Sequence, residues 1–205
     1  MSQKQTKIDA FAEIIESSLD SFLAQSWEWD RFPNFSSLLK VEHSDYTVLG
    51  TVTHIQTGSM DPMRYPFPYQ KTEAELKEEH PQIFEFLKTT FRVHVLGYIN
   101  HNDSLLYMLP PKPCKIHSFV SNCTKIETER FFSNTDFLHL LFAFQQNINN
   151  LDELLLAILR QLEEHKLLTR EKLHEFSNTF SLLTGNDYRR LKLFLSRAQN
   201  IVNYK

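Results

Sequence analysis

Large apolar side chains recur at helical spacing near the start of the chain. Residues 7–27, KIDAFAEIIESSLDSFLAQSW, carry them at steps of three and four, which places them on one face of an α-helix. This apolar stripe consists of Ile8, Phe11, Ile15, Leu19, Phe22 and Leu23. We expect residues 1–30 to form an N-terminal amphipathic helix that docks on the rest of the chain or on a partner protein.

From residue 36 the pattern changes to the period of two that is typical of β-strands. SLLKVE and YTVLGTVTHIQTGS read as strands, and Gly50 inside the second predicts a bulge or a tight bend. The next segment, SMDPMRYPFPYQ, holds three prolines within seven positions, so it is predicted to be a loop with exposed rings.

Helical spacing returns between Lys71 and Phe91. Thr72 and Glu75 form a capping-box pattern, and Pro81 kinks this helix or opens a second one. Its buried face is predicted to consist of Ile83, Phe84, Phe86 and Leu87. Three further strands follow, in FRVHVLGYI, SLLYMLPP and KIHSFVS, with Asn102 and Asp103 at the first turn.

Residues 131–205 carry helix start and stop signals in succession. Ser133 or Asn134 caps the first helix, and the later signals are Asn150 with Glu153, Thr169, Gly185 and Asp187. The predicted fold class is therefore α+β: an N-terminal helix (1–30), a small β-barrel with an inserted helix (31–130) and a C-terminal helical bundle (131–205).

The middle of the chain resembles a known barrel family. VLGTVTHIQTGSMDPMRYPFPYQKTEAELKEEHPQIFEFLKTTFRVHVLGYI, followed by LPPKPCKIHSFV, is similar to the HAS-barrel of HerA-type ATPases and related ATP synthase subunits. A VxGxV strand, a polar loop, a helical insertion and a strand ending in VLGY carry the resemblance. DELLLAILRQ and DYRRLKLFL look like the helical tail of stand-alone proteins with this barrel.

The resemblance implies a role in assembly around a motor that is a separate P-loop domain. This chain has four glycines and no GxxxxGK[ST] motif, so it lacks the backbone cradle for phosphates and the family's ATPase chemistry does not carry over. We expect no catalytic residue and no cofactor.

Charge and composition narrow the choice of partner and compartment. The net charge of −3 favours no generic polyanion partner. The first residues lack a secretory signal, and Cys114 and Cys123 are the only cysteines, which predicts two ordinary thiols in a reducing, cytoplasmic setting. There is no run of about 18 apolar residues, so no membrane span is expected.

Two groups of side chains are candidates for binding. The proline-stiffened loop combines an acid, a guanidinium and three rings, the types that dominate protein interfaces, and this candidate partner surface consists of Asp61, Arg64, Tyr65, Phe67 and Tyr69. The alternative is that these rings fold back over the barrel or the inserted helix. The last predicted helix carries a candidate basic patch, consisting of Arg189, Arg190, Lys192 and Arg197.

Other chemistry has weaker support in the sequence. The nine histidines show no metal-ligand spacing, and Ser59 with Asp61 lacks the base and oxyanion hole that a nucleophile needs. We therefore expect a non-catalytic assembly or adaptor module that binds a protein, with a HerA-like ATPase as the candidate partner. Self-association is a further expectation. The competing functions are a nucleic-acid-binding small barrel and, third, an unrecognised enzyme.

Overall fold

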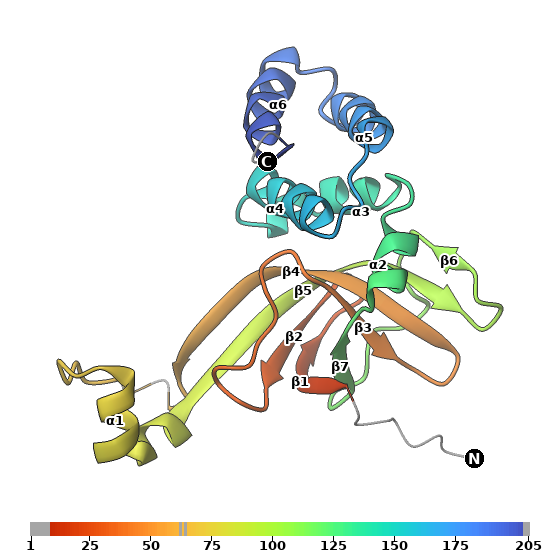
Figure 1. The fold of residues 1–205 in the computed structure, drawn as a ribbon. Coiled ribbons are helices and arrows are strands. Elements are labelled where there is room, and N and C mark those ends of the chain that lie inside the picture. Colours follow the sequence, from red (N-terminus) through yellow and green to blue (C-terminus); the bar gives the residue numbers. More distant parts are fainter. Residues whose placement is uncertain (1–8, 62, 64, 203–205) are drawn as a thin grey trace.

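The chain folds around a closed antiparallel β-barrel (Figure 1). The computed structural model describes residues 9–61, 63 and 65–202. Its strands form one sheet in the order β2-β1-β7-β3-β4-β5-β6, and pairing of β2 with β5 closes six of them into the barrel. The strands are β1 (Ala10–Ser17), β2 (Ser21–Ser26), β3 (Leu38–Glu42), β4 (Tyr46–Ser59), β5 (Leu87–Asn100), β6 (Leu105–Leu106) and β7 (Phe119–Asn122).

The barrel encloses its own hydrophobic core. Period-two alternation directs one set of side chains from each strand inward. Two of the core rings, Phe11 of β1 and Phe91 of β5, stack with centroids 5.8 Å apart. The β-barrel predicted from the alternating runs is thereby confirmed, and with the helices that follow it the chain has the predicted α+β class.

Gly50 of β4 lies close to the backbone of β5. The β4–β5 register shifts between Leu49 and Gly50, which confirms the predicted bulge. A Cβ added at Gly50 would lie 2.6 Å from the backbone oxygen of His94 and 2.6 Å from Val93 Cγ1. Since the carbonyl belongs to the barrel's own ladder, it cannot move aside without disturbing strand pairing.

Gly50→Ala should therefore destabilise the fold, whereas Gly58→Ala further along the same strand should not. A Cβ at Gly58 meets no atom within 4 Å. We expect Gly50→Ala to lower the free energy of unfolding by about 1–3 kcal/mol and Gly58→Ala to change it by less than about 0.5 kcal/mol. Urea unfolding of both variants measures this. Equal, small losses in the two would show that the bulge tolerates a side chain.

The predicted N-terminal helix over residues 1–30 is wrong. Its described part forms the hairpin β1–β2, turned at Ser18, whose backbone N–H donates to Ser21 O at 2.8 Å. A register shift between Ile14 and Glu16, together with this turn, gives apolar residues from two strands a helix-like spacing. Phe11 and Phe22 of the stripe lie in the barrel core, so they form no exposed helical stripe, and self-association stays a prediction.

The segment between β4 and β5 also differs from prediction. The capping box of Thr72 and Glu75 is confirmed, but the helix it opens is short: α1 (Glu73–Glu79) is followed by a 3₁₀ turn, η1 (Pro81–Phe86). Neither contains a buried residue, so the predicted buried face is wrong. Leu87 already belongs to β5, because its pairing with Ser59 extends the ladder.

Two further boundaries differ because tertiary contacts override local preference. The strand predicted in SLLYMLPP shrinks to β6, which pairs with Tyr98 and Ile99. The helix α2 (Lys125–Phe131) was not predicted, although Thr124 and Glu127 form a complete capping box. The next helix begins after Asp136 rather than after Ser133 or Asn134, because the Asn134 side chain accepts from Asp136 N in a turn.

The C-terminal helices lie over one end of the barrel (Figure 1). They are α3 (Phe137–Ala143), the 3₁₀ turn η2 (Gln145–Asn147), α4 (Leu151–Glu164), α5 (Arg170–Leu183) and α6 (Tyr188–Val202). The predicted caps at Asn150 and Thr169 are confirmed by side-chain hydrogen bonds to Glu153 N and Lys172 N. Gly185 has a positive φ of 67°, as expected for a residue that ends a helix.

A second hydrophobic core joins these helices to the barrel. It contains barrel residues Leu38, Leu49 and Leu96 together with side chains from α2 to α6. The helices therefore do not form a separate bundle on a linker, and α2 is the element that connects them to the barrel.

Candidate functional site

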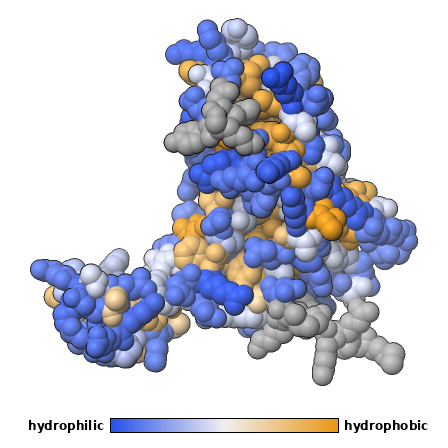
Figure 2. Space-filling view, viewed as in Figure 1, coloured by the Kyte–Doolittle hydropathy of each residue, from blue (hydrophilic) through white to orange (hydrophobic). Residues whose placement is uncertain are grey.

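β4 and β5 extend beyond the barrel as a two-stranded arm. Their pairing continues to Ser59 and Leu87, and Met60 N donates to Phe86 O at 2.7 Å. The connection, residues 60–86, carries α1 and η1 and projects away from the body of the molecule (Figure 1). We call this connection the arm tip. Figure 2 shows it as a separate lobe whose visible surface is mostly hydrophilic, with scattered apolar patches.

Local contacts give the arm tip a defined shape without a core. Asp61 accepts from Met63 N at 2.9 Å, which makes a turn directly after β4. The Tyr69 ring packs against His80 at 5.3 Å and against Phe67 at 5.5 Å. Thr72 N donates to the Glu75 carboxylate at 2.7 Å, which lowers the pKa of that carboxyl. These contacts join residues close in sequence and bury no side chain of α1 or η1, so most side chains of the tip are in contact with solvent.

The candidate partner surface lies on this tip. Tyr65 is 91% exposed and Phe67 72%, so these rings do not fold back over the barrel, whereas Tyr69 is half-covered by its neighbours. Of the two charged candidates, Asp61 lies in the turn after β4 and Arg64 lies outside the described residues. Sequence reasoning missed Met63, which is 89% exposed beside Tyr65, and Phe86 at the base of the tip.

Ion pairs divide the candidate basic patch on α6. Arg190 makes a bidentate pair with Asp152, at 2.6 and 3.3 Å, and its guanidinium lies over the Phe180 ring. Arg197 pairs with Glu153 at 2.6 Å. Both acids lie in the first turn of α4, where a helix favours negative charge. Arg189 and Lys192 are exposed, so the patch offers two cations rather than four for a ligand in solvent.

His94 is the most deeply buried titratable side chain with an open hydrogen-bonding position. It is 1% exposed, its Nδ1 lies 2.8 Å from Thr53 Oγ1, and its Nε2 has no partner among the described residues. Burial lowers the pKa of His94; nearby Arg92 lowers it further, and Asp20 opposes the shift. His43 is shifted in the same direction, first by burial and then by Lys115.

These shifts predict a loss of stability on mild acidification. Below the ordinary pKa of about 6.5, His94 is protonated in the unfolded chain but stays neutral in the folded one. The free energy of unfolding therefore decreases as the pH is lowered, until the pH falls below the pKa of His94 in the folded state. His94→Gln should flatten the difference between pH 7.5 and pH 5.5, measured by urea unfolding, while replacement of the exposed His101 serves as control. Equal pH dependence in His94→Gln and wild type would contradict this assignment.

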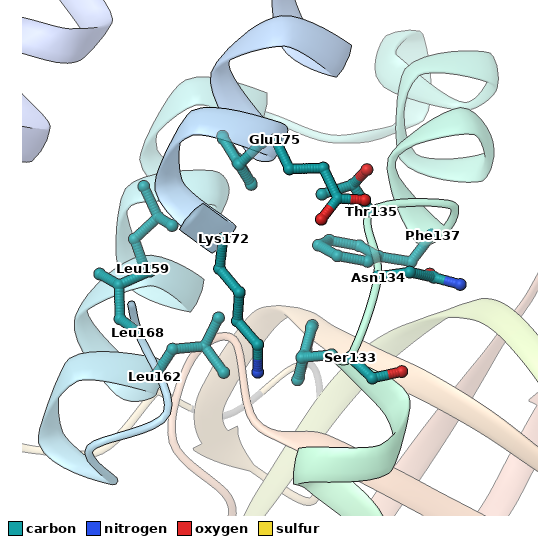
Figure 3. A pocket seen from close by; sticks show the side chains of 11 residues that line it. Ser133, Asn134, Thr135, Phe137, Leu159, Leu162, Leu168, Lys172 and Glu175 are labelled. Carbon is teal, nitrogen blue, oxygen red and sulfur yellow. The ribbon is translucent and has the colours of Figure 1, made fainter. Parts of the chain in front are cut away.

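The helical unit contains a small cavity between α3, α4 and α5 (Figure 3). Leu159 and Leu162 of α4, Phe137 of α3 and Lys172 with Glu175 of α5 are among its lining residues. Its volume of about 20 Å³ accommodates about one water molecule. It is a packing gap and is too small for a substrate.

The remaining reactive groups are isolated from one another. Burial raises the pKa of Cys114 and that of Cys123 to about 12, so both thiols are neutral at pH 7. Within the described part of the chain, no cluster of three histidine, cysteine or acidic side chains is placed to hold a metal ion. None of the described helices combines the length and the apolar character needed to cross a membrane.

Comparison with known proteins gives no assignment. No protein-family model matches the chain, and no curated protein matches its sequence.

Proposed function

We propose that this chain is a non-catalytic assembly or adaptor module that binds a protein partner through the arm tip. The observation that carries the proposal is the exposure of Tyr65 and Phe67 at the end of a projecting arm. Large exposed rings lower solubility and do not stabilise the fold, because they are not packed in a core. Aromatic side chains are, however, enriched at interface hot spots. The prolines of the loop limit the entropy that binding would cost.

The resemblance to the HAS-barrel indicates what kind of partner to expect. In that family the barrel supports assembly around a P-loop motor, which this chain lacks. A separately encoded HerA-like ATPase is therefore our candidate partner. The closed barrel is compatible with this relation, and the arm tip corresponds to the inserted segment on which the resemblance partly rests.

Binding of nucleic acid is less well supported by the arrangement of charges. The pairing of Arg190 and Arg197 with α4 acids leaves few cations for phosphate contacts. An enzymatic role has less support among the described residues, since the only histidine in contact with a hydroxyl group there, His94, is buried against Thr53 and 1% exposed.

The double variant Tyr65→Ala/Phe67→Ala should weaken partner binding without affecting the fold. Each ring lies in solvent, so the melting temperature should stay within about 2 °C of wild type. Loss of two aromatic anchors should weaken the complex by about tenfold or more. Affinity purification with mass spectrometry identifies the partner. Calorimetry then measures the affinity of that partner for wild type and for the double variant.

Tyr188→Ala is the matched control for this experiment. Tyr188 is 73% exposed, but it lies at the start of α6, away from the arm tip. It should leave partner affinity unchanged. If the Tyr65/Phe67 variant bound as tightly as the Tyr188 variant, the arm tip would not be the contact surface.

A further inference from the structure

The two edges of the arm differ in how they are covered. On the β5 side, β2 pairs as far as Thr90, and the chain beyond it continues along the edge, where Thr89 Oγ1 donates to Trp29 O. The Trp29 ring then stacks on Phe84 of the arm tip at 5.5 Å. One edge of the ribbon is thus closed by the chain itself.

The β4 edge loses its neighbour where the arm leaves the barrel. β3 pairs with β4 from Thr47 to Thr51, and the ladder ends with Ser36 N donating to Val52 O at 2.9 Å and Val52 N donating to Ser37 O at 3.1 Å. At Phe35 the chain turns away. Over the described residues, no strand pairs with the outer edge of β4 between His54 and Ser59.

The register identifies the backbone groups on this edge. Met60 N donates to Phe86 O, so the backbone of Met60 points toward β5. Successive residues of a strand direct their N–H and C=O groups to opposite sides. Ile55, Thr57 and Ser59 therefore direct theirs away from β5. The hydroxyl contact of 2.7 Å between Thr57 and Thr89 agrees with this, because side chains approach closest at non-hydrogen-bonded pairs.

A groove lies directly against the first part of the open edge. It has a volume of about 320 Å³ and is bounded by the edge residues, by Phe35 and by the start of α4. Its lining consists of Phe35, Thr53, His54, Ile55, Asn149, Asn150 and Glu153. Figure 2 shows hydrophobic surface in this region, where the arm leaves the body below the helical unit.

We propose that the β4 edge and this groove bind an extended segment of a partner protein, which adds a strand to the sheet. The segment would continue the β3–β4 ladder from the point where Ser36 and Ser37 leave it, pairing with Ile55, Thr57 and Ser59. Proteins usually blunt an open edge with lysine, proline or a covering loop, and His54–Ser59 contains neither lysine nor proline.

The surroundings define the chemistry of this segment. Its side chains alternate, so apolar ones on one face can contact Phe35 and Ile55 in the groove. Residues 60–88 contain six acidic and four basic side chains, a net charge of −2 next to the edge. The segment is therefore extended, apolar at every second position, and flanked by lysine or arginine. A second copy of this chain would have to place its own helical unit next to the groove, whereas a single extended segment needs no such space. We therefore infer a segment of another protein.

Proline at Thr57 tests the backbone contact. Proline is tolerated on a strand edge whose N–H faces solvent, so Thr57→Pro should remove an outward donor without breaking the β4–β5 ladder. Thr57→Val is the matched control, because it also loses the hydroxyl contact with Thr89 but keeps the N–H. The probe is a phage-displayed library of random twelve-residue peptides, selected on the immobilised full chain. An enriched peptide is then synthesised and its affinity measured by fluorescence anisotropy.

We expect peptides of the alternating, basic-flanked kind to bind wild type and Thr57→Val within twofold of each other. Thr57→Pro should bind at least tenfold more weakly. Hydrogen exchange of the wild-type chain should slow at the Ile55 and Thr57 amides when the peptide is added, a result that holds even where Thr57→Pro fails to fold.

Four results would overturn the proposal. The first three are failure to enrich any such peptide, equal affinity for folded Thr57→Pro and Thr57→Val, and protection of amides other than those of Ile55 and Thr57. A wild-type dimer that Thr57→Pro dissociates would also overturn it, since the occupant of the edge would then be a second copy. Because Thr57 lies on the strand rather than on the tip, these outcomes do not depend on the function proposed for Tyr65 and Phe67.

Discussion

Phe131→Ala should lower the free energy of unfolding by about 3–5 kcal/mol, the range for removing a large buried ring. Phe131 ends α2 and is 0% exposed. Its ring packs against Tyr107 at 5.2 Å, Phe132 at 5.0 Å and Phe137 at 6.1 Å. Since its backbone oxygen also accepts from Tyr107 Oη, this residue binds the β6 region to the helices.

The effect should reach beyond one contact, because Phe131 belongs to the core that joins the helical unit to Leu49 and Leu96 of the barrel. Urea unfolding followed by circular dichroism measures the loss. Phe67→Ala is the control, since its ring is 72% exposed and its removal should change stability by less than about 0.5 kcal/mol. A loss below about 1 kcal/mol in Phe131→Ala would mean that the helices and the barrel are stabilised independently.

The central strands and most helix caps could be predicted from the sequence because their signals are local. Val48 and Val52 recur at the period of a strand and both lie in the barrel core, and the side chains of Asn150 and Thr169 each accept from an N–H group of their own helix. The unexpected helix α2 had the same kind of signal, since Thr124 and Glu127 form a capping box that could have been recognised.

The N-terminal hairpin could not be distinguished from a helix by spacing alone. Phe11, Ala12 and Ile14 of β1 all lie in the barrel core, because register shifts between Ala10 and Ala12 and between Ile14 and Glu16 interrupt the period of two. What decides is pairing with β7 and with β5, strands about 70 or more residues away in the chain. Strand pairings over such long sequence separations cannot be recognised from the local pattern of apolar residues.

The candidate site was predicted in composition but not in geometry. The prolines indicated an exposed loop with rings, whereas the length of the arm depends on how far β4 and β5 continue to pair beyond the barrel. The open β4 edge follows from the point where β3 ends. In the same way, the basic residues of α6 gave no sign that Asp152 and Glu153 would neutralise Arg190 and Arg197, because those pairs form between two helices.

Under the proposed function, a partner that binds the arm tip would leave the barrel core unchanged. Its tip contributes no fully buried side chain in α1 or η1, so the tip sequence can change with little effect on folding. In that case the barrel would act as a support, and the β4–β5 ribbon would set the distance between the candidate partner surface and the helical unit.

Removing the whole arm tip should abolish or strongly reduce partner binding. Gly58 and Lys88 face each other, and the register makes them a hydrogen-bonded pair. An Asn-Gly turn that joins them in place of residues 59–87 should close a two-residue hairpin. The barrel core stays complete in this variant, so we expect far-UV circular dichroism of a folded protein and a melting temperature within a few degrees of wild type.

The most direct measurement is affinity purification with quantitative mass spectrometry, performed in parallel on the full chain and on this trimmed variant. If the chain is a protein-binding module that acts through its arm tip, a partner is recovered with the full chain, and its recovery falls at least tenfold with the folded, trimmed variant. Recovery of the same partner in equal amounts from both proteins, or of none from the full chain, would contradict the account.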